Sequence, residues 1–158
     1  MNPMSTVLTV TDLSAESYQL VGLAASIAGS SHGEVILVST YGGGGTSRSS
    51  EPPFAERGNP EWWRERLEAR LRQEGQLLER QRQWCADRGV RCRAELCEDG
   101  SWPDLVLQSA KRSPVDLILV GMHQVSSPCQ VSPDDVKRFA EQAPCPVSVV
   151  RLPAVSAL

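Results

Sequence analysis

The sequence predicts an α/β protein: a doubly wound, Rossmann-like three-layer sandwich around a five-stranded, mostly parallel sheet. Two observations carry this prediction. Short apolar, β-branched runs alternate with helix-period patterns along the chain, and the joins between the first of them are short. A strand–helix–strand unit of this kind places its two strands parallel. With 158 residues the chain has the size of one domain, so we expect a single domain over residues 1–158.

The first strand–helix–strand unit stands at the start of the chain. Residues 6–11 and 34–41 are apolar, β-branched runs, which predicts two strands. Between them, apolar residues recur at three- and four-residue steps over residues 15–28, which predicts an amphipathic helix. Asp12 and Ser14 precede this helix, and either residue could cap it.

A loop and a long helix follow. Residues 42–60 are rich in glycine, serine and proline, a composition that cannot pack, so we expect a flexible surface loop there. Pro60 suits the first position of a helix and Gly89 suits its end, which predicts a helix from residue 60 to about residue 88. The expected buried face of this helix consists of widely spaced residues: Trp63, Leu67, Leu71, Leu78 and Cys85.

The rest of the chain predicts three strands that alternate with two helices. Residues 90–96 alternate apolar and polar, as a strand covered on one face does. The most hydrophobic run, residues 115–121, predicts a central strand. Two shorter helices are expected at residues 102–112 and 134–142, and a last strand at residues 147–152.

Composition and charge exclude several classes of protein. A hydrophobic fraction of 41% and a charged fraction of 22% are ordinary for a globular protein. A net charge of -3 argues against a general nucleic-acid binder, so we expect no nucleic-acid partner. No apolar run approaches the ~20 residues of a membrane helix, and residues 1–10 show no secretory signal pattern. We therefore expect a cytoplasmic protein without membrane insertion.

The cysteines predict free thiols. There are five of them, and no two form a C-x-x-C pair, so a disulfide framework and a structural zinc site are both unexpected. His123 and Cys129 are the one histidine–cysteine pair close together in the sequence. A thiolate beside a histidine is reactive, so a thiol-based redox role for Cys129 stays open as an alternative.

Four short motifs are spread over the chain. They are DLS at 12–14, GSWP at 100–103, DLILVGMH at 116–123 and APCPVSVVR at 143–151. An aspartate after the first strand, a Gly-x-Pro turn (here with one residue inserted), a strand that ends in Gly-x-His, and a closing APCPV strand are together typical of one family. The chain thus resembles the universal stress protein family over essentially its whole length.

The resemblance raises the question of ATP, because some members of that family bind it through a glycine-rich pattern, G-x2-G-x9-G-[ST]. Gly121 matches the first glycine, but Gln124 stands at the second position. The final Gly-Ser pair aligns with Pro133 and Asp134, or with Asp134 and Asp135. Proline has no N–H to offer a phosphate, and a carboxylate repels one. We therefore expect no bound cofactor, with ATP or AMP binding as an alternative.

The same resemblance indicates which residues would line a degenerate nucleotide site. The aspartate that matches Asp12 lies beside the adenine and ribose in ATP-binding relatives, so Asp12 has two open interpretations, ligand contact and helix cap. Thr40 and Tyr41 end the second strand and would line the same region. The vestigial nucleotide-binding residues are then Asp12, Thr40, Tyr41, Gly121, His123, Gln124, Pro133, Asp134 and Asp135.

The resemblance also implies a homodimer formed by antiparallel pairing of the last strands. The residues expected at that interface are Pro146, Val147, Ser148, Val149, Val150 and Arg151. We therefore expect a regulatory or adaptor protein that acts through protein partners, with no reaction of its own. The alternatives are a nucleotide-sensing stress protein and the redox protein that uses Cys129.

Overall fold

The centre of the protein is a five-stranded sheet in which every neighbouring pair of strands is parallel. This computed structural model describes residues 5–39, 60–96, 102–123 and 133–155. The strand order is β3-β2-β1-β4-β5, which confirms the predicted doubly wound α/β sandwich. The strands are β1 (Thr6–Thr11), β2 (Glu34–Ser39), β3 (Arg91–Leu96), β4 (Leu117–His123) and β5 (Val147–Leu152).

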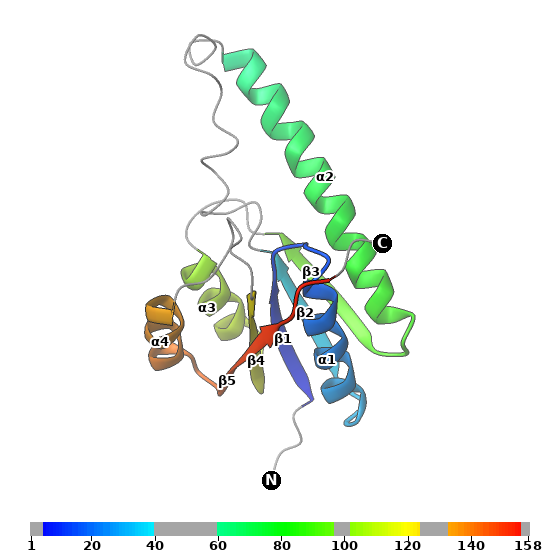
Figure 1. Ribbon diagram of the computed structural model, residues 1–158, viewed down its shortest axis with the longest axis vertical. Helices are drawn as coiled ribbons and strands as arrows, with labels where there is room; N and C mark the ends of the chain where they lie inside the picture. The colour runs from blue at the N-terminus through cyan, green and yellow to red at the C-terminus, as the bar shows by residue number, and fades with distance from the viewer. Residues whose placement is uncertain (1–4, 40–59, 97–101, 124–132, 156–158) are drawn as a thin grey trace.

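Helices cover both faces of the sheet (Figure 1). One face packs against α1 (Ser17–Gly29) and α2 (Pro60–Ala86), around a core that includes Val7 and Leu37. The opposite face packs against α3 (Trp102–Arg112) and α4 (Pro133–Gln142). Among these described segments, none of the helices combines the length and the apolar character needed to cross a bilayer.

The sequence placed β4 two residues too early, at 115–121 instead of Leu117–His123. Asp116 precedes the strand and holds the start of β1. Its Oδ2 accepts hydrogen bonds from the backbone N–H groups of Ser5 and Thr6 at 3.2 and 3.0 Å. At its end, β4 continues to pair with β5 as far as His123 and Leu152. Gly121 therefore lies inside the strand and not in a turn after it.

Helix α2 is the other element that differs from expectation. Its first turns extend beyond the sheet (Figure 1), and Leu67, expected on the buried face, is 41% exposed. The helix packs through its second half, where Leu78 and Cys85 are buried together with the polar residues Glu74 and Gln81. These four residues recur at steps of three and four, so the buried stripe of α2 is partly polar.

Candidate functional site

The candidate site lies where β1 and β4 end. From β1 the chain moves outward to β2 and β3, and it then returns to place β4 on the other side of β1. This reversal is a topological switch point, and open α/β sheets bind their ligands outside the carboxyl ends of the strands at such a point. Asp12 follows β1 directly and His123 ends β4, so two predicted site residues belong to the two strands that border the switch point.

The turn after β1 is held by Asp12. Its Oδ1 accepts hydrogen bonds from the backbone N–H of Ser14 at 3.0 Å and from the Ser14 hydroxyl. Between them, Leu13 has a φ of 64°, a left-handed conformation that a bulky residue adopts only under constraint. Asp12 therefore braces the turn that leads into α1. At the start of α1, the Oγ and the carbonyl oxygen of Ser14 both accept from the N–H of Ser17.

Behind this turn lies a buried hydrogen-bond network that joins α2 to β1 and α1. The Thr11 hydroxyl donates to Gln81 Oε1 at 2.8 Å, and Gln81 Nε2 donates to the Ser17 hydroxyl at 2.6 Å. Ser17 in turn donates to the carbonyl oxygen of Ser14 at 2.6 Å, and Thr11 accepts from the N–H of Leu13 at 3.1 Å. Because these side chains are at most 2% exposed, the network fixes the position of the turn.

Two turns of helix before Gln81, α2 buries a carboxyl group. Glu74 is fully buried, and its Oε1 accepts a hydrogen bond from Arg70 at 2.7 Å. Its Oε2 has no hydrogen-bond partner among the described residues. Burial raises the pKa of Glu74 above its ordinary value, while the bond and the charge of Arg70 oppose that rise. In the polar stripe of α2, both the oxygen and the nitrogen of the Gln81 side chain have hydrogen-bond partners, whereas only one oxygen of the Glu74 carboxyl has a partner in the described part of the chain.

On the other side of the switch point, Gly121 is required by packing. A Cβ at this position would lie 2.6 Å from Leu152 Cδ1 and 3.4 Å from Leu20 Cδ2. Leu152 ends β5 and is itself buried, so it has little room to move. The close approach of β4 and β5 against α1 therefore accounts for a glycine at this position without any ligand.

The helix start beyond β4 carries the other predicted residues. Helix α4 begins at Pro133, and Asp134 in its first turn is exposed. The side chains of His123, Pro133 and Asp135 are outside the described set, although their backbone positions belong to β4 and α4. The remaining predicted residues, Thr40, Tyr41, Gln124 and Cys129, lie outside the described residues.

Strand β5, the predicted dimer strand, lies at an edge of the sheet. Ile118 N–H donates to the carbonyl oxygen of Pro146 at 3.0 Å. Because backbone groups alternate along a strand, those of Ser148 and Val150 also turn toward β4, while those of Val147, Val149 and Arg151 turn toward the open edge. The side chain of Val149 is 41% exposed. The strand thus offers unpaired backbone groups beside an exposed apolar side chain.

Sequence reasoning missed the polar side chains contributed by α2. The spacing of Gln81 and Glu74 could have indicated that both lie on the buried face of α2, because each is three or four positions from Leu78. In the described part of the chain, no group of three or more histidine, cysteine, aspartate or glutamate side chains is arranged to hold a metal ion. The site is therefore built from hydroxyl, amide and carboxyl groups.

The comparisons with known proteins agree on the fold. A universal stress protein UspA from Lactobacillus plantarum superposes with a TM-score of 0.71 at 19% identity, covering 96% of this chain and 100% of that one. A universal stress protein from Archaeoglobus fulgidus in complex with dAMP gives 0.59 at 16% identity, covering 96% and 99%. One in complex with cAMP gives 0.62 at 17%, covering 96% and 99%.

Sequence comparison assigns the family. Among curated proteins no match is found. The model of the universal stress protein family, in contrast, matches residues 4–151, which is nearly the whole chain and includes all nine described helices and strands except the last residue of β5. The chain belongs to the universal stress protein family.

Proposed function

We propose that this protein is a homodimeric regulatory protein that acts through protein partners, without a reaction of its own and without a bound nucleoside triphosphate. One observation carries the triphosphate part of the proposal. Helix α4 begins with Pro133 and continues with the exposed Asp134, at the position where the family's ATP-binding pattern has Gly-Ser. A helix start attracts anions through its free N–H groups, and here one N–H is missing and a negative charge is added.

Two further residues support the same conclusion. Asp12 uses its Oδ1 to brace the turn after β1, and Gly121 is needed for the contact between β4 and Leu152. Both residues match positions of the family's nucleotide site, and both have a structural role that does not depend on a nucleotide.

Titration calorimetry with ATP, with and without magnesium, tests the proposal. We expect no binding by the wild-type protein at micromolar concentrations. The double variant Pro133→Gly/Asp134→Ser restores the Gly-Ser pair and should bind ATP more tightly than the wild type, because it regains an N–H and loses a like charge. Micromolar binding by the wild type that disappears in Asp12→Ala would contradict the proposal.

The homodimer part rests on the open edge of β5. Two copies of an edge strand can pair antiparallel about a two-fold axis, and each then donates and accepts the same backbone hydrogen bonds. Val149 turns both its backbone groups and an exposed side chain outward from the middle of the strand. An antiparallel pair centred near Val149 would satisfy those groups and cover that side chain.

Sedimentation of two variants at the same position tests the dimer. Val149→Pro removes an N–H that faces the open edge and leaves the bonds to β4 in place, so it should weaken the dimer. Two bonds are lost per dimer, each worth about 0.5–1.5 kcal/mol, which corresponds to about tenfold or more in affinity. Val149→Ala keeps the N–H and should remain dimeric at the same concentration. A wild-type protein that sediments as a monomer at tens of micromolar overturns this part.

A nucleotide sensor is the second candidate function. Two of the similar structures were determined with cAMP and with dAMP bound, and neither ligand carries a triphosphate. Such a ligand would not need the α4 start to hold a polyphosphate, so the Pro133 argument does not apply to it. Titration with AMP and cAMP in the same calorimeter separates the two candidates, since a regulatory protein without a nucleotide gives no heat with either one.

A further inference from the structure

Two cysteines lie on either side of the turn that joins α2 to β3. Cys85 lies one residue before the end of α2 and is fully buried, and Cys92 is the second residue of β3 and is partly exposed. Both side chains belong to the same hydrophobic cluster beneath α2. The turn between them contains Gly89 with a φ of 81°, which brings the strand back along the helix. Both cysteines are free thiols.

The two thiols change each other's pKa. A hydrogen bond to Cys92, helped by the nearby Arg88 guanidinium, lowers the pKa of Cys85 even though burial opposes the change. The same hydrogen bond, together with burial and the charge on Cys85, raises the pKa of Cys92. The pair therefore gives up its first proton easily and its second proton with difficulty, so that the two sulfurs share one negative charge.

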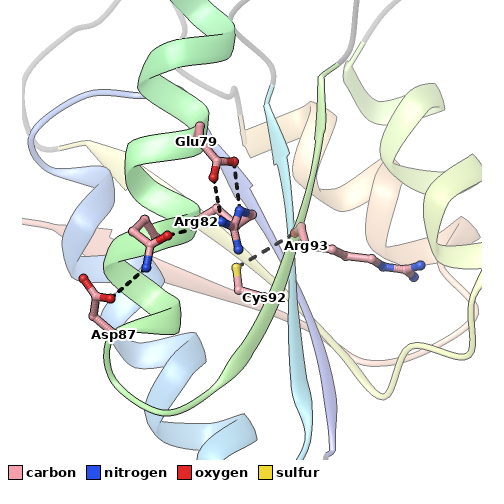
Figure 2. Close-up of polar contacts among 6 residues, drawn as sticks. Glu79, Arg82, Asp87, Cys92 and Arg93 are labelled. Carbon is pink, nitrogen blue, oxygen red and sulfur yellow. Dashed lines mark hydrogen bonds and ion pairs between the residues drawn. The ribbon is translucent and has the colours of Figure 1, made fainter.

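Arginines surround this shared charge. Arg82 lies one helical turn before Cys85, is fixed by two hydrogen bonds to Glu79 at 2.8 and 2.6 Å, and favours a negative charge on Cys92. Figure 2 shows the Cys92 side chain on the α2 side of β3, the side on which Arg82 lies. The Cys92 sulfur is 3.9 Å from the Arg93 carbonyl oxygen. Arg88, one turn after Cys85, donates to the carbonyl oxygen of Trp84 at 3.0 Å.

Cationic neighbours and a paired thiol are what distinguish a reactive cysteine from a buried, inert one. We propose that Cys85 and Cys92 form a modification site at which a hydroperoxide oxidises the two thiols to a disulfide. This site lies at the end of α2 and uses neither the residues of the switch point nor the open edge of β5. It also differs from the thiol that the sequence indicated, Cys129.

The oxidation proceeds in two balanced steps. Cys92 reacts first because its side chain is the one that solvent reaches. When the proton that the two sulfurs share lies on Cys85, the Cys92 thiolate attacks hydrogen peroxide, the O–O bond breaks, and Cys92 becomes a sulfenic acid. The hydroxide that leaves takes the proton from Cys85 and departs as water. The Cys85 thiolate formed in this way attacks Cys92 Sγ, the S–S bond forms and the S–O bond breaks. The departing hydroxide takes a proton from solvent and becomes the second water. Two thiols are oxidised and one peroxide is reduced to two waters.

Peptide mapping of the full-length protein tests the proposal directly. Trypsin cuts after Arg82, Arg88, Arg91 and Arg93, so Cys85 and Cys92 end in separate peptides, 83–88 and 92–93. After peroxide treatment and blocking of free thiols, we expect these two peptides to be joined, with a mass two hydrogens below their sum. The matched control Cys145→Ser removes an unrelated thiol and should give the same joined peptide.

Variants of the pair identify the intermediate. In Cys85→Ser, Cys92 has no partner to attack it, so it should accumulate as a sulfenic acid that a dimedone probe labels. In Arg82→Gln, loss of the charge beside Cys92 should slow disulfide formation about two- to threefold. The proposal is overturned if peroxide leaves both cysteines separately blocked, or if Cys92 is joined to Cys97 instead of Cys85.

Discussion

The two strands that border the switch point end in opposite ways. On the β1 side, polar groups are bonded to one another: Thr11, Gln81 and Ser17 form a closed, buried chain of hydrogen bonds, and Asp12 is bonded into its own turn. On the β4 side, Gly121 is packed under Leu152, and α4 begins with a proline and an exposed aspartate. One side is held together by polar groups, and the other side offers an anion little to bind.

The difference shows which parts of a binding region are maintained by the fold alone. The β1 residues would keep their positions without a ligand, because breaking their network leaves buried polar groups unpaired. On the β4 side, the start of α4 carries Pro133 and the exposed Asp134 in place of a glycine–serine pair. Four substitutions test this difference between the β1 side and the β4 side.

The largest effect is expected from Gln81→Leu. The change removes the acceptor of the Thr11 hydroxyl and the donor to Ser17 inside the core, and each buried group left unpaired costs about 1–3 kcal/mol. We expect the free energy of unfolding to fall by about 2–3 kcal/mol, measured by urea denaturation. Gln83→Leu is the matched control, because Gln83 is exposed and its hydrogen-bond partners among the described residues, Asp87 and Arg82, lie at the surface. Equal effects of the two changes would contradict the network.

A smaller loss of stability is expected from Gly121→Ala. The new Cβ would lie 2.6 Å from Leu152 Cδ1, and overpacking a core costs about 1–3 kcal/mol. At Gly75 of α2, a Cβ would meet nothing within 4 Å, so Gly75→Ala should stabilise the helix by about 0.5–1 kcal/mol. Thermal unfolding of both variants gives the comparison. If Gly121→Ala is as stable as the wild type, packing does not explain this glycine.

Much of the fold could be predicted because hydrophobic periodicity is local information. The runs that became β1, β2 and β5 are visible in a few residues each, and their alternation with helices leaves few topologies open. The end of β4 could not be found in this way. Gly121 resembles a turn residue, and the reason for it, the side chain of Leu152, lies in another strand.

The candidate site was predictable only where its residues follow a strand directly. Asp12 was found because an aspartate after the first strand is conspicuous. Gln81 was not found, because in a helix dense with arginine and glutamate a glutamine looks like one more surface residue. Its role depends on contact with Thr11, 70 positions earlier in the chain, and no local pattern contains that contact.

A modest effect is expected from Asp12→Ala, which removes the acceptor for the N–H and hydroxyl of Ser14. We expect a loss of about 1 kcal/mol in the free energy of unfolding, because the turn can be partly resolvated. Asp12→Asn keeps a carbonyl oxygen in the same place and should lose less than half as much. If Asn and Ala are equally damaging, the negative charge of Asp12 matters more to stability than its hydrogen bonds to Ser14.

The smallest effect concerns Glu74 and depends on pH. Since burial raises its pKa in the folded state, the folded protein holds a proton there more tightly than the unfolded chain does. This tighter binding of the proton stabilises the folded state at pH values below the ordinary pKa of Glu74. The stabilisation is lost as the pH rises through the raised pKa. Relative to the wild type, Glu74→Gln should therefore gain stability between pH 4 and pH 7, by about 1–3 °C in Tm.

Glu79→Gln provides a control of opposite sign for this pH series. The hydrogen bond from Arg82 lowers the pKa of Glu79. The stability of the wild type relative to Glu79→Gln should therefore increase as the pH rises. Opposite slopes for two glutamates of the same helix would show that the polar stripe of α2 buries the Glu74 carboxyl at a cost in stability, whereas the exposed Glu79 is stabilised by its bond to Arg82. If the difference in Tm between Glu74→Gln and the wild type does not change with pH, solvent reaches Glu74 and the polar stripe of α2 is not buried at that position.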